Sequence, residues 1–195
     1  MKRLFDITFS LLGLILFSGL ILLAWIIASF ETGSNGFFFQ RRVGKNGKLF
    51  NIIKIKTMKS NMRIDTTVTT LGDMRITKSG RFFRKTKIDE LPQLWNVLLG
   101  KMSFVGPRPD VPGFADQLTG KDKRVLDILP GITSIASLKY KNEEELLSKQ
   151  SDPVFYNKNV IFPDKVKLNL EYIEKWSFWL DLKIIIWTVF GKNNE

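Results

Sequence analysis

The most apolar part of the chain is an uninterrupted run near its N-terminus. From Ile7 to Phe30 none of the 24 residues is charged, and Leu and Ile dominate. At about 1.5 Å per residue, such a helix is long enough to cross a hydrocarbon core of about 30 Å. We therefore predict a membrane helix here. A cleaved signal peptide is less favoured, because its apolar stretch usually has about 7 to 15 residues. A buried helix of a soluble protein is the third alternative.

The charged flanks of this run are in conflict. Lys2 and Arg3 precede it and a strongly basic segment follows it, so both flanks favour the cytoplasmic side. A straight membrane helix can satisfy only one of them. A helix that bends in the bilayer and returns satisfies both, and Ser18-Gly19 near the middle is a suitable place for the bend. The alternative is that these are merely two small residues of a straight span.

Shorter patterns predict the next elements. Phe37–Val43 and Leu49–Thr57 resemble two strands around Gly44–Lys48, whose Asn-Gly pair suits a hairpin turn. The polar, threonine-rich stretch Met58–Leu71 predicts a short helix and a loop. Apolar residues then recur at the spacing of one helix face over Glu90–Leu98. Together these patterns predict an α+β fold that is mostly helical, with a small β-hairpin.

Two further helical segments are predicted toward the C-terminus. The acidic run Glu143–Glu145 is most simply the solvated start of a helix. Apolar side chains at helical spacing then form a stripe, which suits either the membrane interface or the protein core. The stripe consists of Ile173, Trp176, Leu180, Ile184 and Trp187.

Composition limits the chemistry. The 195 residues include no cysteine and no histidine, which excludes disulfides, Cys/His zinc sites, cysteine nucleophiles and His-based triads. The net charge of +11 lies in one segment, because Arg41–Lys87 holds 14 basic residues against Asp65 and Asp73, a net of +12. Such a block attracts phosphates of nucleic acid, lipid or a small substrate, or is simply a solvated basic face.

Two adjacent carboxylates, Asp89 and Glu90, follow this basic segment. In one interpretation Asp89 is the N-cap of the following helix and Glu90 is favoured near the positive end of its dipole. In the other, the carboxylate pair and the nearby cations hold a phosphate and a divalent metal ion. The local pattern favours the two interpretations equally.

Three arginines are candidates for binding phosphate. Arg81 and Arg84 share a helix face upstream of the carboxylates, where two guanidinium groups could clamp a diphosphate. Arg108 lies between Pro107 and Pro109, which stiffen the backbone and lower the entropy lost on binding an anion. The alternative for Arg108 is an ordinary proline turn with a surface arginine.

Taken together, these segments resemble the bacterial sugar transferases, monotopic phosphoglycosyl transferases that start glycan assembly on polyprenol phosphate. Seven motifs occur in the family's order over nearly the whole chain, which is more specific than any one of them. The motifs lie at Lys2–Asp6, Phe39–Lys48, Lys54–Met58, Thr77–Arg84, Asp89–Val97, Ser103–Pro109 and Leu129–Thr133.

The resemblance implies a domain organisation and a location. Residues 1–31 would form a re-entrant membrane hairpin, and residues 32–195 a catalytic domain with interfacial amphipathic helices on the cytoplasmic face of the bacterial inner membrane. Many members carry Ser-Pro at the bend, where this chain has Ser18-Gly19. Glycine permits a kink but, unlike proline, removes no backbone hydrogen bond. This chain also has Lys56 where Arg is commoner, and Ser134-Ile135-Ala136 where longer members often carry Gly-Trp.

The resemblance also implies a mechanism. Asp89 would attack the sugar-linked phosphate of a UDP-sugar, releasing UMP and leaving an acyl phosphate, and polyprenol phosphate, expected to be undecaprenyl phosphate, would then take the phosphosugar. Glu90 would hold Mg²⁺. The expected substrate contacts are Arg81, Arg84, Arg108, Lys54, Lys56, Pro107 and Pro109.

Two rival functions belong to other classes. A membrane-anchored basic module would bind anionic lipid or nucleic acid without catalysis, and a metal-dependent phosphatase would transfer the phosphate to water. The resemblance favours the transferase, with membrane lipid and no nucleic acid as partner. The sugar, the glycan pathway and the oligomeric state stay open, a homodimer being one alternative.

Overall fold

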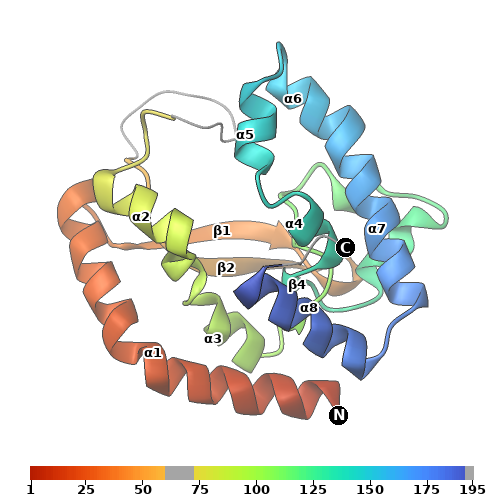
Figure 1. Cartoon of the computed structure of the whole chain (residues 1–195), viewed down its shortest axis with the longest axis horizontal. Helices are drawn as coiled ribbons and strands as arrows, with labels where there is room; N and C mark the ends of the chain where they lie inside the picture. The colour runs from red at the N-terminus through yellow and green to blue at the C-terminus, as the bar shows by residue number, and fades with distance from the viewer. Residues whose placement is uncertain (60–72, 192–195) are drawn as a thin grey trace.

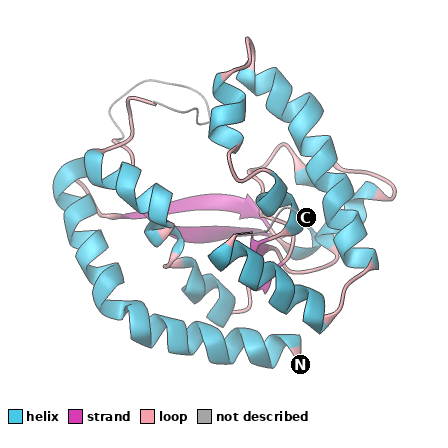
Figure 2. Ribbon diagram, in the orientation of Figure 1, coloured by secondary structure: helices cyan, strands magenta, loops and turns pink. Residues whose placement is uncertain are grey.

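The computed structural model describes residues 1–59 and 73–191 and is mostly helical, as predicted (Figure 2). Most of the predicted segment Met58–Leu71 therefore lies outside the described residues. The helices are α1 (Lys2–Thr32), α2 (Lys78–Thr86), α3 (Gln93–Leu98), α4 (Ile135–Lys139), α5 (Glu143–Ser148), α6 (Pro153–Tyr156), α7 (Phe162–Glu174) and α8 (Phe178–Phe190). The strands are β1 (Phe37–Val43), β2 (Leu49–Ile55), β3 (Ser103–Val105) and β4 (Gly131–Thr133).

Helix α1 is one continuous helix that turns a corner along its length, first running beneath the domain and then rising beside α2 (Figure 1). The Ser10 and Ser18 hydroxyls donate hydrogen bonds to carbonyls three residues earlier, at 3.1 and 2.9 Å, and such side-chain bonds often bend helices. Backbone hydrogen bonding continues through Ser18-Gly19, so the predicted break into a hairpin is not seen. Among the described helices, α1 is long and apolar enough to cross a membrane.

Polar contacts tie both ends of α1 to the rest of the domain. At its start, the Arg3 guanidinium donates to the carbonyls of Val97 and Leu98 at 2.7 and 2.8 Å, at the C-terminal end of α3. At its end, Glu31 accepts hydrogen bonds from the backbone amide and the hydroxyl of Ser79. The helix is therefore fastened to one globular body at both ends.

The predicted hairpin is confirmed. Strands β1 and β2 pair antiparallel from Phe37 opposite Ile55 to Val43 opposite Leu49. The turn places Asn46 at φ 57° and Gly47 at φ 73°, the left-handed region that Asn and Gly tolerate best. The second strand ends at Ile55, two residues earlier than predicted. Strands β3 and β4 form a separate short parallel pair.

The core lies between α1, the hairpin and α3. Leu14, Ala24 and Ala28 of α1 form one buried cluster with Ile55 and Leu94. The long apolar helix is therefore also part of the packing that positions the hairpin and the segment after Asp89.

The C-terminal stripe is divided, which corrects the prediction of one helix. Helix α7 ends at Glu174, and α8 starts after Ser177, whose hydroxyl accepts a hydrogen bond from the Leu180 amide at 3.1 Å. An N-capping serine starts a new helix and thereby fixes a change of direction. Ile184 is fully buried, while Trp179 is 78% exposed.

Candidate active site

All nine predicted site residues line one cavity of about 2440 Å³. Strand β2, helix α2, the turn after α2 and the loop that follows β3 bring them together from segments distant in sequence. They are Lys54, Lys56, Arg81, Arg84, Asp89, Glu90, Pro107, Arg108 and Pro109. Such a volume exceeds the about 300–1,000 Å³ of an ordinary small-molecule pocket, so there is room for more than one substrate group.

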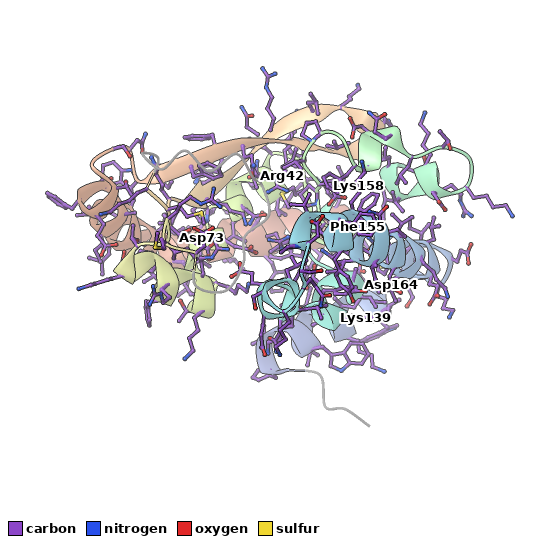
Figure 3. All side chains as sticks on the ribbon, turned by 90° about the horizontal axis from the view of Figure 1, so that it is seen from above. Arg42, Asp73, Lys139, Phe155, Lys158 and Asp164 are labelled. Carbon is purple, nitrogen blue, oxygen red and sulfur yellow. The ribbon has the colours of Figure 1, made fainter. Side chains whose placement is uncertain are left out.

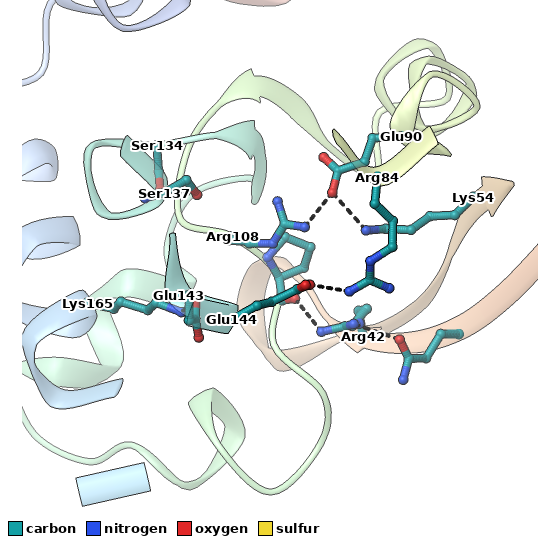
Figure 4. A network of polar contacts seen from close by, with 12 residues as sticks. Arg42, Lys54, Arg84, Glu90, Arg108, Ser134, Ser137, Glu143, Glu144 and Lys165 are labelled. Atoms are coloured by element: carbon teal, nitrogen blue, oxygen red, sulfur yellow. Dashed lines mark hydrogen bonds and ion pairs between the residues drawn. The ribbon is translucent and has the colours of Figure 1, made fainter. Parts of the chain in front are cut away.

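Glu90 is held by two cations at the centre of this cavity (Figure 4). Its Oε1 accepts from Lys54 Nζ at 2.9 Å and from Arg108 at 2.6 Å. Burial raises the pKa of Glu90, but Arg108 and Lys54 outweigh burial and hold that pKa well below its usual range. Burial in turn lowers the pKa of Lys54, against the attraction of Glu90. Glu90 is thus an anion that holds in place the charged groups of Lys54 and Arg108, two candidates for binding phosphate.

Asp89 differs from its neighbour. Its side chain is buried, and Oδ1 has no hydrogen-bond partner among the described residues. Burial raises the pKa of Asp89 to about 6; Lys54 lowers that pKa and the adjacent Glu90 raises it further. The carboxylate thus keeps an oxygen that no described protein group satisfies.

The backbone around Asp89 explains this position. Lys87 ends α2 in the left-handed conformation at φ 60°, and Ile88–Glu90 form a tight 3₁₀ turn. Helix α3 begins only at Gln93 and has no side-chain cap, so the interpretation of Asp89 as an N-cap is wrong, as is a helix starting at Glu90. Leu91 and Leu94 pack into the core behind the turn, which fixes where the carboxylates point.

The remaining predicted cations differ in their contacts. Arg84 forms an ion pair across the cavity with Glu144 of α5. Lys56 Nζ donates to the Ser34 hydroxyl at 2.7 Å. Within the described ranges 1–59 and 73–191, the exposed Arg81 guanidinium forms no hydrogen bond or ion pair. Arg81 is thus the cation with the fewest contacts to give up when a phosphate binds.

Comparison with known proteins identifies the family. The model of the family described as bacterial sugar transferase matches residues 1–193. The chain belongs to this family. It is 38% identical to the uncharacterized sugar transferase EpsL of Bacillus subtilis, over 97% of this chain and 85% of that protein.

Two longer relatives carry more specific names. The chain is 38% identical to a UDP-glucose:undecaprenyl-phosphate glucose-1-phosphate transferase of Klebsiella pneumoniae, over 97% of this chain and 39% of that protein. It is 35% identical to the galactosyl transferase CpsE of Streptococcus agalactiae, over 96% of this chain and 41% of that protein. The chain thus spans about two fifths of these two relatives.

The cavity of this family member also contains polar residues that sequence reasoning missed. Arg42 of β1 donates to the Pro109 carbonyl at 3.1 Å and to Gln40 at 2.6 Å. Arg42 therefore links β1 to the loop that carries Arg108. Burial, reinforced by Arg108, lowers the pKa of Arg42 to about 10. The alternation of Gln40 and Arg42 on one face of a predicted strand was a usable signal.

The acidic run Glu143–Glu145 starts α5, as predicted, but its side chains are not simply solvated. Glu143 accepts from Lys165 Nζ of α7 at 2.6 Å, and Glu144 binds Arg84, so these two side chains face the cavity rather than solvent alone. A local ion pair joins the third, Glu145, to Lys149 on the same helix. Between α4 and α7, Lys139 and Asp164 lie close together and pair at 2.7 Å (Figure 3).

The site suits Mg²⁺ only in combination with phosphate. No group of three acidic side chains is placed to hold a metal ion in the part of the chain that the structure describes, so a metal cage made by the protein alone is not seen there. Mg²⁺ is commonly bound by one or two carboxylates together with substrate phosphates. Glu90 fits that donor set, because Lys54 and Arg108 both bind its Oε1 and no described residue binds its other oxygen.

Proposed function

We propose that this protein moves a sugar phosphate from a UDP-sugar to a polyprenol phosphate, releases UMP and thereby starts glycan assembly. The observation that carries the proposal is Asp89, a buried carboxylate with an unpartnered oxygen in a cavity that also holds Lys54, Arg84 and Arg108. The relatives named as glucose-1-phosphate transferases support the reaction class.

A catalytic role explains the buried carboxylates better than anion binding does. A module that only bound lipid or nucleic acid would weaken its own site by burying Asp89 and Glu90 among its cations. A nucleophile for phosphoryl transfer needs this arrangement, because the cations offset the charge of the diphosphate while the carboxylate attacks.

The chemistry is a double displacement at one phosphorus. An oxygen of Asp89 forms a bond to the sugar-linked phosphorus, the bond from that phosphorus to the bridging oxygen breaks, and UMP leaves with the electron pair. A polyprenol phosphate oxygen then attacks the same phosphorus and the bond to Asp89 breaks, giving the polyprenyl diphosphate sugar. Charge spread over the phosphoryl oxygens makes cations the main source of stabilisation, which suits a site without histidine.

Glu90 would hold Mg²⁺, which would neutralise diphosphate oxygens when bound. Arg108 and Lys54 would orient the diphosphate next to it, because Glu90 already fixes both of their charged groups. Arg84 is the expected third phosphate contact, once its ion pair with Glu144 opens.

We further propose that α1 enters and leaves the cytoplasmic leaflet of the inner membrane. A straight span would separate its ends by the thickness of the bilayer, yet Arg3 and Glu31 are both fastened to one globular body. The bend of α1 supports this placement (Figure 1). The cavity also extends from Asp89 to Leu12 and Leu16 of α1, which supports entry of an apolar acceptor from the membrane.

The decisive experiment measures UMP release from a panel of UDP-sugars with Mg²⁺, with and without polyprenol phosphate. We expect a burst of about one UMP per protein without lipid and sustained turnover with lipid. The isosteric variant Asp89→Asn should show neither. Sustained release without lipid would identify a hydrolase. No release from any UDP-sugar, while vesicles or nucleic acid still bind, would identify the binding module.

The membrane placement has its own test. The chain has no cysteine, so Leu4→Cys and Lys121→Cys each provide a unique thiol. We expect a membrane-impermeant maleimide to label both from the cytoplasmic side of inverted vesicles. Labelling from opposite sides would refute re-entry and indicate a straight span.

A further inference from the structure

The cavity also contains an uncharged side chain that has no partner among the described residues. Asn169 of α7 is 8% exposed and lines the cavity. Its Oδ1 is buried, and neither end of its amide hydrogen-bonds to any other residue in the described ranges 1–59 and 73–191. Buried amides in native proteins are almost always satisfied, so an unsatisfied one facing a cavity indicates that a ligand supplies the partner.

The position of Asn169 is rigidly defined. Val166 and Tyr172, three residues before and after it, are buried on the same face of α7. Val166 packs with Val43 at the end of β1, and Tyr172 packs with Val105 at the end of β3. The amide between them is therefore held against the segment that leads to Arg108, on a helix that cannot turn without breaking two core contacts.

The groups around it are charged but balanced. Lys165, one turn earlier on α7, binds Glu143 at 2.6 Å. Asp110 is close enough to this pair to feel both charges. Burial raises the pKa of Asp110 to about 6, and Glu143 raises that pKa further. Lys165 lowers it most, followed by Arg42 and Arg108. Lys165 and Arg42 thus stand against Asp110 and Glu143, while Arg108 is already paired with Glu90 at 2.6 Å. In Figure 4, Glu143 and Lys165 lie beyond Arg108 as seen from Glu90.

This balance separates the cavity into two halves. Around Asp89, cations predominate and suit a diphosphate. On the wall that carries Asn169 and Lys165, Asp110 and Glu143 offset the charges of Lys165 and Arg42, so a phosphate would gain little there. A neutral polyol would find carboxylate acceptors and an amide that both donates and accepts. Sugar hydroxyl and N-acyl groups require that combination.

We propose that Asn169 and Asp110 form a subsite that hydrogen-bonds the transferred sugar and so sets which UDP-sugar is used. This proposal rests on the proposed function. Asn169 would contact the sugar directly through its free amide, and Asp110 would accept from a hydroxyl while Lys165 keeps its charge balanced.

The test compares Asn169→Leu and the isosteric Asn169→Asp with wild type, using the same panel of UDP-sugars. The matched control is Asn159→Leu, because Asn159 is exposed and outside the cavity. We expect kcat/KM for the preferred UDP-sugar to fall about tenfold or more in Asn169→Leu, as for loss of a hydrogen bond. The ratio of kcat/KM between the preferred UDP-sugar and the others should therefore become smaller. Inhibition by UMP should stay unchanged, because UMP lacks the sugar.

Several results would overturn the subsite. A parallel loss of UMP inhibition would assign Asn169 to the nucleotide instead. An unchanged sugar profile in both folded variants, with melting temperatures near that of wild type, would remove Asn169 from recognition. Failure of the wild type itself to release UMP from any UDP-sugar would refute the proposed function rather than the subsite alone.

Discussion

Lys2 and Asp181 form a polar junction that fastens the first turn of α1 to α8. Lys2 Nζ donates to Asp181 at 2.7 Å, to the Val105 carbonyl at 2.8 Å and to the Tyr172 hydroxyl at 3.0 Å. Asp181 is 5% exposed and also accepts from Tyr172 at 2.6 Å and Trp176 at 3.1 Å. Three side chains, Lys2, Tyr172 and Trp176, therefore donate hydrogen bonds to this buried carboxylate.

Replacing Asp181 by Asn should destabilise the fold strongly. Removing one member of a buried ion pair costs about 3–5 kcal/mol because the other charge is left uncompensated. The Lys2 side chain is 26% exposed, so water partly relieves it and we expect about 3 kcal/mol. Lys2→Met should cost less, about 2 kcal/mol, because Tyr172 and Trp176 still donate to Asp181.

The assay is denaturant unfolding in detergent micelles, with a double-mutant cycle. The double variant should cost about 1.5–2 kcal/mol less than the sum of the single variants, because neither charge is then left alone. The control is Glu145→Gln on the exposed pair with Lys149, which should leave the stability nearly unchanged. Additive single effects, or losses as small as that control, would refute the view that this junction fastens α1.

Two further predictions concern the cavity. Burial raises the folded pKa of Asp110 from 3.8 to about 6, so the folded state binds more protons than the unfolded state between these values. Asp110 should therefore lower wild-type stability by about 2 kcal/mol as the pH rises from 4 to 6. Asp110→Asn should flatten that part of a melting-temperature profile, and an unchanged slope would contradict this. Glu144→Gln frees Arg84 and should lower KM for the UDP-sugar about two- to fivefold, whereas a raised KM would mean that Glu144 itself helps to bind substrate.

Local patterns were sufficient for several parts of this protein. Asn46-Gly47 tolerates positive φ, so the hairpin and its position follow from two residues. Asp89 and Glu90 are neighbours in the chain, and their surrounding cations lie in motifs that mark the family, so the candidate dyad and its cations were predictable. The capping interpretation failed because Lys87 takes the left-handed conformation, which inserts a tight turn before α3.

The sequence by itself determined the long apolar helix, the hairpin, the basic segment and the carboxylate pair, since each depends on residues a few positions apart. The tertiary structure alone decided which charges meet. It brought Glu144 to Arg84 over 60 residues and Lys2 to Asp181 over 179, and it placed Asn169 beside the cavity with an unpaired amide. Local propensity carries no information about such pairs, because they depend on how the bend of α1 and the end of α7 bring segments together that are distant in the sequence.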